Sequence, residues 1–290
     1  MGVIEAILYG IVQGLTEWLP ISSTAHLRIL PALLNQPDPG SAFTAVIQLG
    51  TTLAVLIYFG KDLGAAISAW ARSFRGKTNS PEERIGWAVF WGSFPIVLIG
   101  FALRKVISSP DVRSLYVISG TLIVMGIIML IAERVGTQKR GAEEITVKDG
   151  IVVGLWQALA LVPGMSRSGS TISGALFAGL ERSTAARFSF LLSVPSVLAA
   201  GLFELIENRH EILGQQLGPV LIATAVSFVV GYASIAFLLK FIQKNGFSAF
   251  VVYRIVLGIV LLVLISQGIV KPTEAAPSPP EVAQSVSTTL

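Results

Sequence analysis

The chain has 290 residues, of which 53% are hydrophobic and only 13% are charged, and its mean hydropathy is +0.73. A soluble domain carries about 25% charged residues, so this composition indicates a protein whose surface largely faces lipid. The sequence contains no cysteine, which excludes disulfides, thiol nucleophiles and thiolate metal sites. The formal net charge of +4 comes without a basic run that interleaves aromatic residues, so we expect no nucleic-acid partner.

A membrane-spanning helix needs about 20 predominantly apolar residues. Two apolar stretches, 1–35 and 147–182, are each interrupted by a loop that contains proline and several serines. We expect each to form a re-entrant hairpin, whose second short helix leaves on the side where the first entered. The tail 271–290 is rich in Pro, Ser, Thr and Ala and is expected to be disordered. Six further stretches qualify as spans, namely residues 41–60, 85–103, 114–133, 186–206, 218–239 and 249–268.

The two halves of the chain resemble each other. Residues 10–16 and 154–160 have similar sequences, lie 144 positions apart, and each lead to a proline and a serine-containing loop. In each half an interrupted hairpin precedes three spans, so the second half must be inverted, which brings the two broken segments together near the midplane. We therefore predict an all-α membrane protein, a single domain over 1–270, with six transmembrane helices and two re-entrant helix hairpins in inverted-topology repeats of about 1–133 and 147–268.

The distribution of basic residues orients the predicted spans. One side of the membrane holds the connectors 61–84, 134–149 and 240–248 and the turn 181–187, which carry thirteen Lys and Arg residues. The other side carries six, namely Arg28, Arg104, Lys105, Arg113, Arg209 and Lys271. Cytoplasmic loops are enriched in these residues, so the richer side should be cytoplasmic and the mouth of the first hairpin should open outward. The richer side holds Lys61, Arg72, Arg75, Lys77, Arg84, Arg134, Lys139, Arg140, Lys148, Arg182, Arg187, Lys240 and Lys244.

Arg167 lies within the second interrupted stretch, where inserting an arginine costs roughly 2.5–3.5 kcal/mol. Ser166, Ser168 and Thr171 surround it, and Gly164 permits close backbone approach. Backbone N–H groups at the start of the following helix add further donors. A guanidinium with N–H groups and hydroxyls suits a phosphate. The alternative is an arginine that snorkels to lipid head groups, but the glycine and serine neighbours have no role in snorkelling.

Ser22, Ser23, Thr24 and His26 follow Pro20 in the first interrupted stretch. Serine is a poor nucleophile unless a base accepts its proton, and histidine is the usual base. A helix that begins near Ser22 would place Ser23 and His26 on one face. The alternative is that the hydroxyls only cap this helix. We favour the cap for Ser22 alone and a functional role for Ser23 with His26.

Glu17 lies in the same apolar stretch, one helical turn after Gln13. A carboxylate there should have a raised pKa or a cationic partner. It could accept a proton, bind a divalent cation or pair with Arg167 or His26, and the simplest alternative is a structural ion pair with arginine. An oxygen-only site of Glu17, hydroxyls and phosphate would suit Mg²⁺ or Ca²⁺. Arg254, in the last span, is interpreted as structural and paired with a carboxylate inside the bundle.

Segments 13–26 (Gln-Gly-Leu-Thr-Glu-Trp-Leu-Pro-Ile-Ser-Ser-Thr-Ala-His) and 163–171 (Pro-Gly-Met-Ser-Arg-Ser-Gly-Ser-Thr) resemble the two signature motifs of the undecaprenyl-diphosphate phosphatase family, the bacitracin-resistance proteins. Segments 43–50 and 188–192 extend the resemblance. It implies a hydrolase of the bacterial inner membrane that needs a divalent cation and releases phosphate from a C55 isoprenoid diphosphate, a polyprenyl lipid. That reaction recycles the carrier for peptidoglycan synthesis, and bacitracin competes by sequestering the diphosphate.

The resemblance also assigns roles to residues. The family's catalytic serine corresponds to Ser23, its histidine to His26 and its arginine to Arg167. We therefore predict these three residues and Glu17 as catalytic, with Glu17 also a candidate metal ligand. The predicted substrate-binding residues are Gln13, Ser22, Thr24, Ser166, Ser168 and Thr171.

Inverted repeats with broken helices are also typical of secondary transporters, so a transporter or flippase of a phosphate-bearing lipid or anion is the alternative function. Glu17 and the Ser23–His26 pair favour hydrolysis. A lipid phosphatase with a histidine nucleophile would need a second histidine near the serine–arginine loop, which this chain lacks. Thr44, where the family often carries a carboxylate, and Gln48 could line the cavity. The sequence carries no signal for an oligomeric state.

Overall fold

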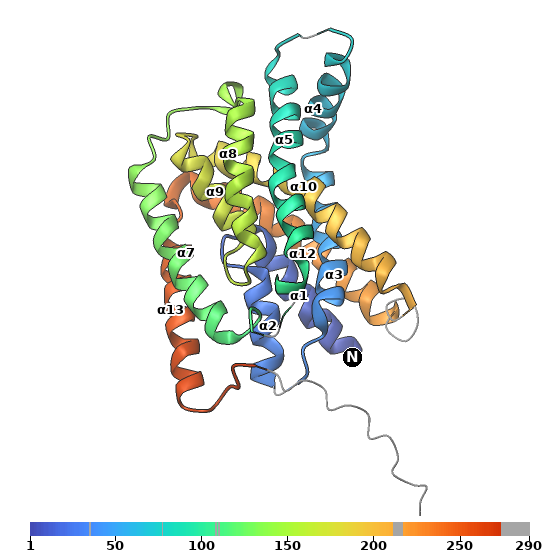
Figure 1. Cartoon of the computed structure of the whole chain (residues 1–290), viewed down its shortest axis with the longest axis vertical. Helices are drawn as coiled ribbons and strands as arrows, with labels where there is room; N and C mark the ends of the chain where they lie inside the picture. The colour runs from blue at the N-terminus through green and yellow to red at the C-terminus, as the bar shows by residue number, and fades with distance from the viewer. Residues whose placement is uncertain (35, 77, 108, 110, 211–216, 274–290) are drawn as a thin grey trace, which may run out of the picture.

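The computed structural model describes residues 1–34, 36–76, 78–107, 109, 111–210 and 217–273, and these form helices with one isolated bridge between Arg140 and Leu180 (Figure 1). Residues 274–290 of the predicted tail lie outside the described residues. In chain order the helices are α1 (Val3–Trp18), α2 (Ser23–Leu34), α3 (Gly40–Tyr58), α4 (Gly60–Ser73), α5 (Pro81–Ala102), α6 (Arg104–Ile107), α7 (Leu115–Val135), η1 (Ala142–Glu144), α8 (Val147–Ala158), η2 (Leu159–Leu161), α9 (Arg167–Phe177), α10 (Arg182–Glu207), α12 (Leu217–Asn245) and α13 (Ser248–Ser266).

Five helices of the described chain are long and apolar enough to cross a membrane, and they are α5, α7, α10, α12 and α13. Each falls on one of the predicted spans between residues 85 and 268. The remaining predicted span, 41–60, coincides with α3, which continues after a bend of 80° into α4, so this pair is a sixth candidate. The described residues thus form an all-α, multi-pass membrane protein.

The connector predicted over residues 61–84 is partly wrong, because Gly60–Ser73 forms the helix α4. Ala66 and Ala69 are buried on one face of α4, whereas most of its other side chains are exposed. Trp70 packs edge-on against Trp87 of α5, with ring centroids 5.8 Å apart. The polar residues that suggested a connector therefore belong to the exposed face of an amphipathic helix.

Two pairs of helices, α1–α2 and α8–α9, turn back inside the bundle. In Figure 1 the open end of α1–α2 lies at the bottom, near the N-terminus, and the open end of α8–α9 lies toward the top. α1 packs along α12, and α8 packs along α5. Both approaches require glycine, because a Cβ atom at Gly10 would lie 2.6 Å from the carbonyl oxygen of Ala223, and one at Gly154 would lie 2.2 Å from that of Gly92. This close packing fixes the position of the turns that follow α1 and α8.

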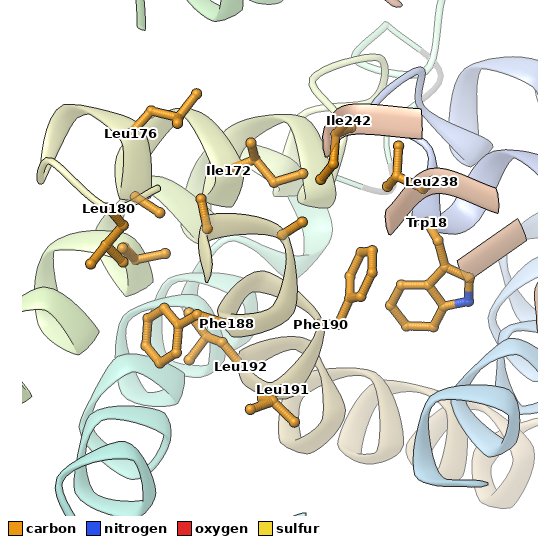
Figure 2. Close-up of a cluster of buried hydrophobic side chains, with 14 of the residues drawn as sticks. Trp18, Ile172, Leu176, Leu180, Phe188, Phe190, Leu191, Leu192, Leu238 and Ile242 are labelled. Carbon is orange, nitrogen blue, oxygen red and sulfur yellow. The ribbon is translucent and has the colours of Figure 1, made fainter. Parts of the chain in front are cut away.

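The largest hydrophobic core holds the end of α1. Trp18 is buried and packs edge-to-face against Phe190 of α10, with ring centroids 5.1 Å apart. Ile172 of α9 and Leu238 and Ile242 of α12 belong to the same cluster (Figure 2). Burying a large apolar side chain contributes about 1.5–3 kcal/mol. Because Trp18 ends α1, this packing determines where the first turn begins.

Candidate active site

Each interrupted helix pair has a serine with left-handed backbone directly before its second helix. Ser22 has a φ of 76° and Ser166 a φ of 70°, a region that residues other than glycine rarely adopt and that is found at functional sites. Ser22 Oγ accepts a hydrogen bond from the Ala25 amide at 3.3 Å, and Ser166 Oγ accepts one from the Gly169 amide at 3.1 Å. Both serines therefore cap helices, and the cap predicted for Ser22 is confirmed.

Glu17 is the centre of a buried hydrogen-bond network. Its Oε2 accepts hydrogen bonds from Ser23 Oγ at 2.7 Å, from Gln13 Nε2 at 2.9 Å and from Gln48 Nε2 at 3.3 Å. Its Oε1 forms an ion pair with the Arg167 guanidinium. The side chain of Glu17 is only 2% exposed, so these donors and this cation replace the water that an ionised carboxylate needs.

The shared carboxylate brings the two serine-rich turns to one place. Ser23 comes from the first turn and Arg167 from the second, and each contacts a different oxygen of Glu17. A second link joins the turns, because the amide of Gly164 donates to Thr24 Oγ1 at 3.4 Å. A hydroxyl, a carboxylate and a guanidinium therefore lie within reach of one phosphate group.

These groups line a cavity of about 490 Å³. The lining residues from α5, including Ile96, Val97 and Phe101, are apolar. Those from α10 are mixed, because Ser196 and Glu204 accompany the apolar Ala200 and Phe203. Three arginines also line the cavity, and they are Arg28, Arg104 and Arg113. A cluster of polar groups beside apolar side chains suits a ligand with a charged head and a hydrocarbon chain.

The cavity separates the predicted site residues into two groups. Ser168 Oγ donates to the carbonyl oxygen of Leu19 at 3.1 Å, and Thr171 Oγ1 donates to that of Arg167 at 2.7 Å. These residues support the turns from within the protein. The predicted residues that line the cavity are Glu17, Ser22, Ser23, Thr24, Ser166 and Arg167, and those that do not are Gln13, His26, Ser168 and Thr171.

His26 makes its hydrogen bonds away from Ser23. Its Nδ1 lies 2.7 Å from the carbonyl oxygen of Ser22, and its Nε2 lies 2.6 Å from the hydroxyl of Tyr253. A carbonyl oxygen only accepts, so Nδ1 carries the proton, and in the neutral ring Nε2 accepts from Tyr253. The rings of His26 and Tyr253 also stack, with centroids 5.6 Å apart. Among the described residues no hydrogen bond joins His26 to Ser23, and the catalytic role of His26 stays a prediction.

Arg254 of α13 is fully buried beneath the two turns. The predicted carboxylate partner is wrong, because within the described chain its guanidinium bonds backbone carbonyls instead. It donates to Pro20 O at 3.1 Å in the first turn and to Gly164 O at 2.7 Å in the second. It also donates to Leu122 O of α7 at 3.3 Å. Broken helices leave carbonyls without partners, and the five N–H groups of one guanidinium can satisfy several of them.

A profile of the bacitracin resistance protein BacA family matches residues 6–260. The chain belongs to this family. It is 48% identical over 279 residues to an undecaprenyl-diphosphatase of Chloroherpeton thalassium, covering 92% of this chain and 98% of the relative. It is 47% identical to undecaprenyl-diphosphatase 2 of Streptomyces coelicolor, covering 93% and 97% of the two chains. An undecaprenyl-diphosphatase of Myxococcus xanthus is 48% identical, with coverage of 94% and 92%. The family resemblance carried by the two motifs is thus confirmed.

Several residues of this BacA-family site were missed or only noted in the sequence. Gln48 lines the cavity, as suggested. Tyr253 has no motif around it, and nothing in the sequence indicates its contact with His26. Arg28 and Arg113 were counted only as loop charges. The presence of several arginines on the otherwise less basic side of the membrane was a signal that could have indicated them.

A divalent cation at this BacA-family site would find the carboxylate of Glu17 beside the serine-rich turns, and Glu204 of α10 also lines the cavity. Within the described ranges no group of three or more His, Asp or Glu side chains could hold a metal ion. Mg²⁺ is commonly bound through one or two carboxylates together with substrate phosphates. Glu17 and the neighbouring hydroxyls of Ser23 and Thr24 therefore fit a cation whose coordination is completed by phosphate oxygens.

Proposed function

We propose that this protein is an integral membrane phosphatase that hydrolyses undecaprenyl diphosphate to undecaprenyl phosphate and inorganic phosphate, and so recycles the lipid carrier for peptidoglycan synthesis. The names of its BacA-family relatives support this substrate and do not favour the transporter alternative. The observation that carries the proposal is the simultaneous contact of Ser23 and Arg167 with the Glu17 carboxylate. A nucleophile, a proton acceptor and an anion-binding group then meet in a cavity whose apolar lining residues suit a prenyl chain.

In the first step, Ser23 Oγ attacks the terminal phosphorus of the diphosphate in line with the bridging oxygen. The hydrogen bond from Ser23 to Glu17 supports Glu17 as the base that accepts the proton. The bond from phosphorus to the bridging oxygen breaks, and the lipid monophosphate leaves with the electron pair. Arg167 and backbone N–H groups at the start of α9 stabilise the charge on the transferring phosphoryl group.

In the second step, water attacks the phosphoserine. Glu17 returns its proton to Ser23 Oγ as the bond from phosphorus to Oγ breaks. The released phosphate keeps both hydrogens of the water molecule, so the serine and the carboxylate regain their initial states. Arg167 pairs with Glu17 before substrate arrives, and its further N–H groups are available to phosphate oxygens.

Glu17 and the hydroxyls of Ser23 and Thr24 would hold a divalent cation, Mg²⁺ or Ca²⁺, together with phosphate oxygens of the substrate. When bound, it neutralises charge on the diphosphate oxygens. Chelation should stop phosphate release, and either cation added back should restore it. His26 is expected to hold the first turn in place by donating to the Ser22 carbonyl.

We also infer that the two halves are inverted repeats and that α1–α2 and α8–α9 are re-entrant hairpins. Gly10 and Gly154, 144 residues apart, each permit a close approach to a helix of the other half. Ser22 and Ser166, also 144 residues apart, share the left-handed backbone. The opposite openings of the two hairpins support the same conclusion (Figure 1).

The distribution of charge supports an orientation in the bacterial inner membrane. Arg28, Arg104 and Arg113, which line the cavity, belong to the six basic residues of the poorer side. By the positive-inside rule the cavity then opens to the outer face. Bacitracin that binds the diphosphate head group would compete with the enzyme for substrate at this face.

The test is phosphate release from undecaprenyl diphosphate by the purified protein with Mg²⁺. Ser23→Ala should lose turnover, and rapid quenching of the wild type should yield a peptide phosphorylated at Ser23. Ser266→Ala is the matched control, because Ser266 is exposed at the end of α13 and bonds only its own helix. Full turnover by Ser23→Ala would exclude the covalent route, and a wild type that binds but never cleaves the substrate would favour a transporter.

A further inference from the structure

A second cavity, of about 620 Å³, lies at the opposite end of α3 from the candidate active site. The active-site cavity uses Ala45 and Gln48 near the start of α3, whereas the second cavity uses Ile57 and Phe59 at its end. The start of α10 and the last turns of α12 complete the second cavity. The two cavities share no lining residue, so the mechanism above leaves the second one without a role.

The second cavity has an excess of positive charge. Lys61, Arg187 and Lys240 line it together with one carboxylate, that of Asp62. Arg187 is paired with Asp62 at 2.6 Å. Lys61 and Lys240 make no ion pair within the described residues, so two ammonium groups are left for a ligand. Basic pockets between membrane helices bind the phosphate head groups of lipids.

Apolar side chains next to these cations are exposed on the protein surface. Ile57 is 54% exposed, and Ala236 is exposed as well, although both line the cavity. A free inorganic anion would gain nothing from these surfaces. A lipid would place its head group on the lysines and the first part of its chain over Ile57 and Ala236. The lining therefore favours a phosphate-bearing lipid over free phosphate.

The second cavity also repeats a feature of the active-site cavity. Phe59 and Phe203 lie 144 residues apart, at the ends of α3 and α10. The guanidinium of Arg187 lies over the Phe59 ring at 5.6 Å, and that of Arg104 lies over the Phe203 ring at 4.7 Å. Each arginine pairs with an acidic residue about one turn beyond its phenylalanine. Arg104 and Phe203 line the cavity expected to hold a lipid diphosphate, so the matching arrangement suits a related head group.

We propose that the second cavity is a binding site for the phosphate head group of a lipid, held by Lys61 and Lys240, with the chain over the exposed side chains at the ends of α3 and α12. The site is separate from Ser23 and takes no part in hydrolysis. A lipid monophosphate and an anionic phospholipid present the same chemistry to the two lysines, and the experiment below distinguishes them.

The test uses the full chain in detergent and a photoreactive dodecyl phosphate with a diazirine beside its head group. Labelled peptides from 57–62 and 236–243 report the second cavity, and peptides around the serine-rich turns report the first. In a variant with both Lys61→Gln and Lys240→Gln, labelling of the second cavity should fall about fivefold for each lysine removed. Lys244→Gln is the matched control, because Lys244 is exposed one turn further along α12 and does not line the cavity.

Competition identifies the ligand. Unlabelled dodecyl phosphate should displace the probe from the second cavity, whereas inorganic phosphate at equal concentration should not displace it. Displacement by phosphatidylglycerol as well would show that the site also accepts phospholipids. Undiminished labelling in the double variant, or equal displacement by inorganic phosphate, would overturn the proposal. Phosphate release from undecaprenyl diphosphate should be unchanged in the Lys61→Gln, Lys240→Gln double variant and in Lys244→Gln. The labelling result is therefore independent of the proposed hydrolysis.

Discussion

Replacing Arg254 by methionine should remove hydrogen bonds that hold both serine-rich turns in place. The guanidinium donates to Gly164 O at 2.7 Å, Pro20 O at 3.1 Å and Met165 O at 3.2 Å, and methionine has no donor. A hydrogen bond to a charged group contributes about 1.5–3 kcal/mol, so the two shortest bonds alone account for about 3–6 kcal/mol. At about 2–4 °C per kcal/mol, Tm should fall by about 6 °C or more.

Turnover should fall further than the loss of folded protein explains. A displacement of about 1 Å between catalytic groups is enough for a hundredfold loss of rate. Thermal unfolding in detergent and phosphate release below the new Tm measure the two effects separately. Arg254→Lys should be intermediate, because a single ammonium reaches fewer carbonyls, and Arg134→Met, at an exposed position in α7, is the control. A methionine variant with the Tm and turnover of the wild type would refute the idea that Arg254 holds the turns.

Three further predictions concern other parts of the fold. Glu17→Gln should lower turnover by about a hundredfold to ten-thousandfold, the usual contribution of a general base, and phosphate release at the wild-type rate would exclude that role. Gly154→Ala should lower Tm, because its Cβ would lie 2.2 Å from a carbonyl oxygen of α5. Gly120→Ala should not, because its Cβ would meet no atom of another helix within 4 Å. Burial acts to raise the pKa of Asp149, but hydrogen bonds from Arg140 and Thr146 outweigh it, so the pKa is lowered overall. Its stabilising contribution is therefore present above the unfolded pKa of about 3.9 and is lost as pH falls through the folded value. Asp149→Asn should flatten the dependence of Tm on pH in this range.

The sequence predicted those features that depend on short stretches of residues. The apolar stretches became helices near the predicted bounds, because about 20 apolar residues in a row have few other options in a membrane. Proline and clustered serine marked the two turns, and α2 and α9 begin there. The pairing of Glu17 with Arg167 was among the partners considered, and it is confirmed.

The features that the sequence could not predict depend on contacts between distant helices. Tyr253 lies 227 residues from His26, and no periodicity indicates that α13 reaches α2. The partners of Arg254 are backbone carbonyls, which every residue has, so side-chain types could not reveal them. The helix α4 was interpreted as a connector because its polar residues alternate in the sequence with the small apolar residues that pack on α5.

Ser23 and Arg167 are 144 residues apart, so they occupy the same position in the two halves, each directly after a serine with positive φ. In the proposed mechanism this position supplies the nucleophile in the first half and the anion-binding group in the second. Glu17 has no such counterpart, because Leu161 stands 144 residues further on. A second carboxylate there would repel the diphosphate and compete for Arg167. The asymmetry of the site therefore follows from the proposed chemistry, in which one base is enough to activate one serine and the second turn binds the negative charge.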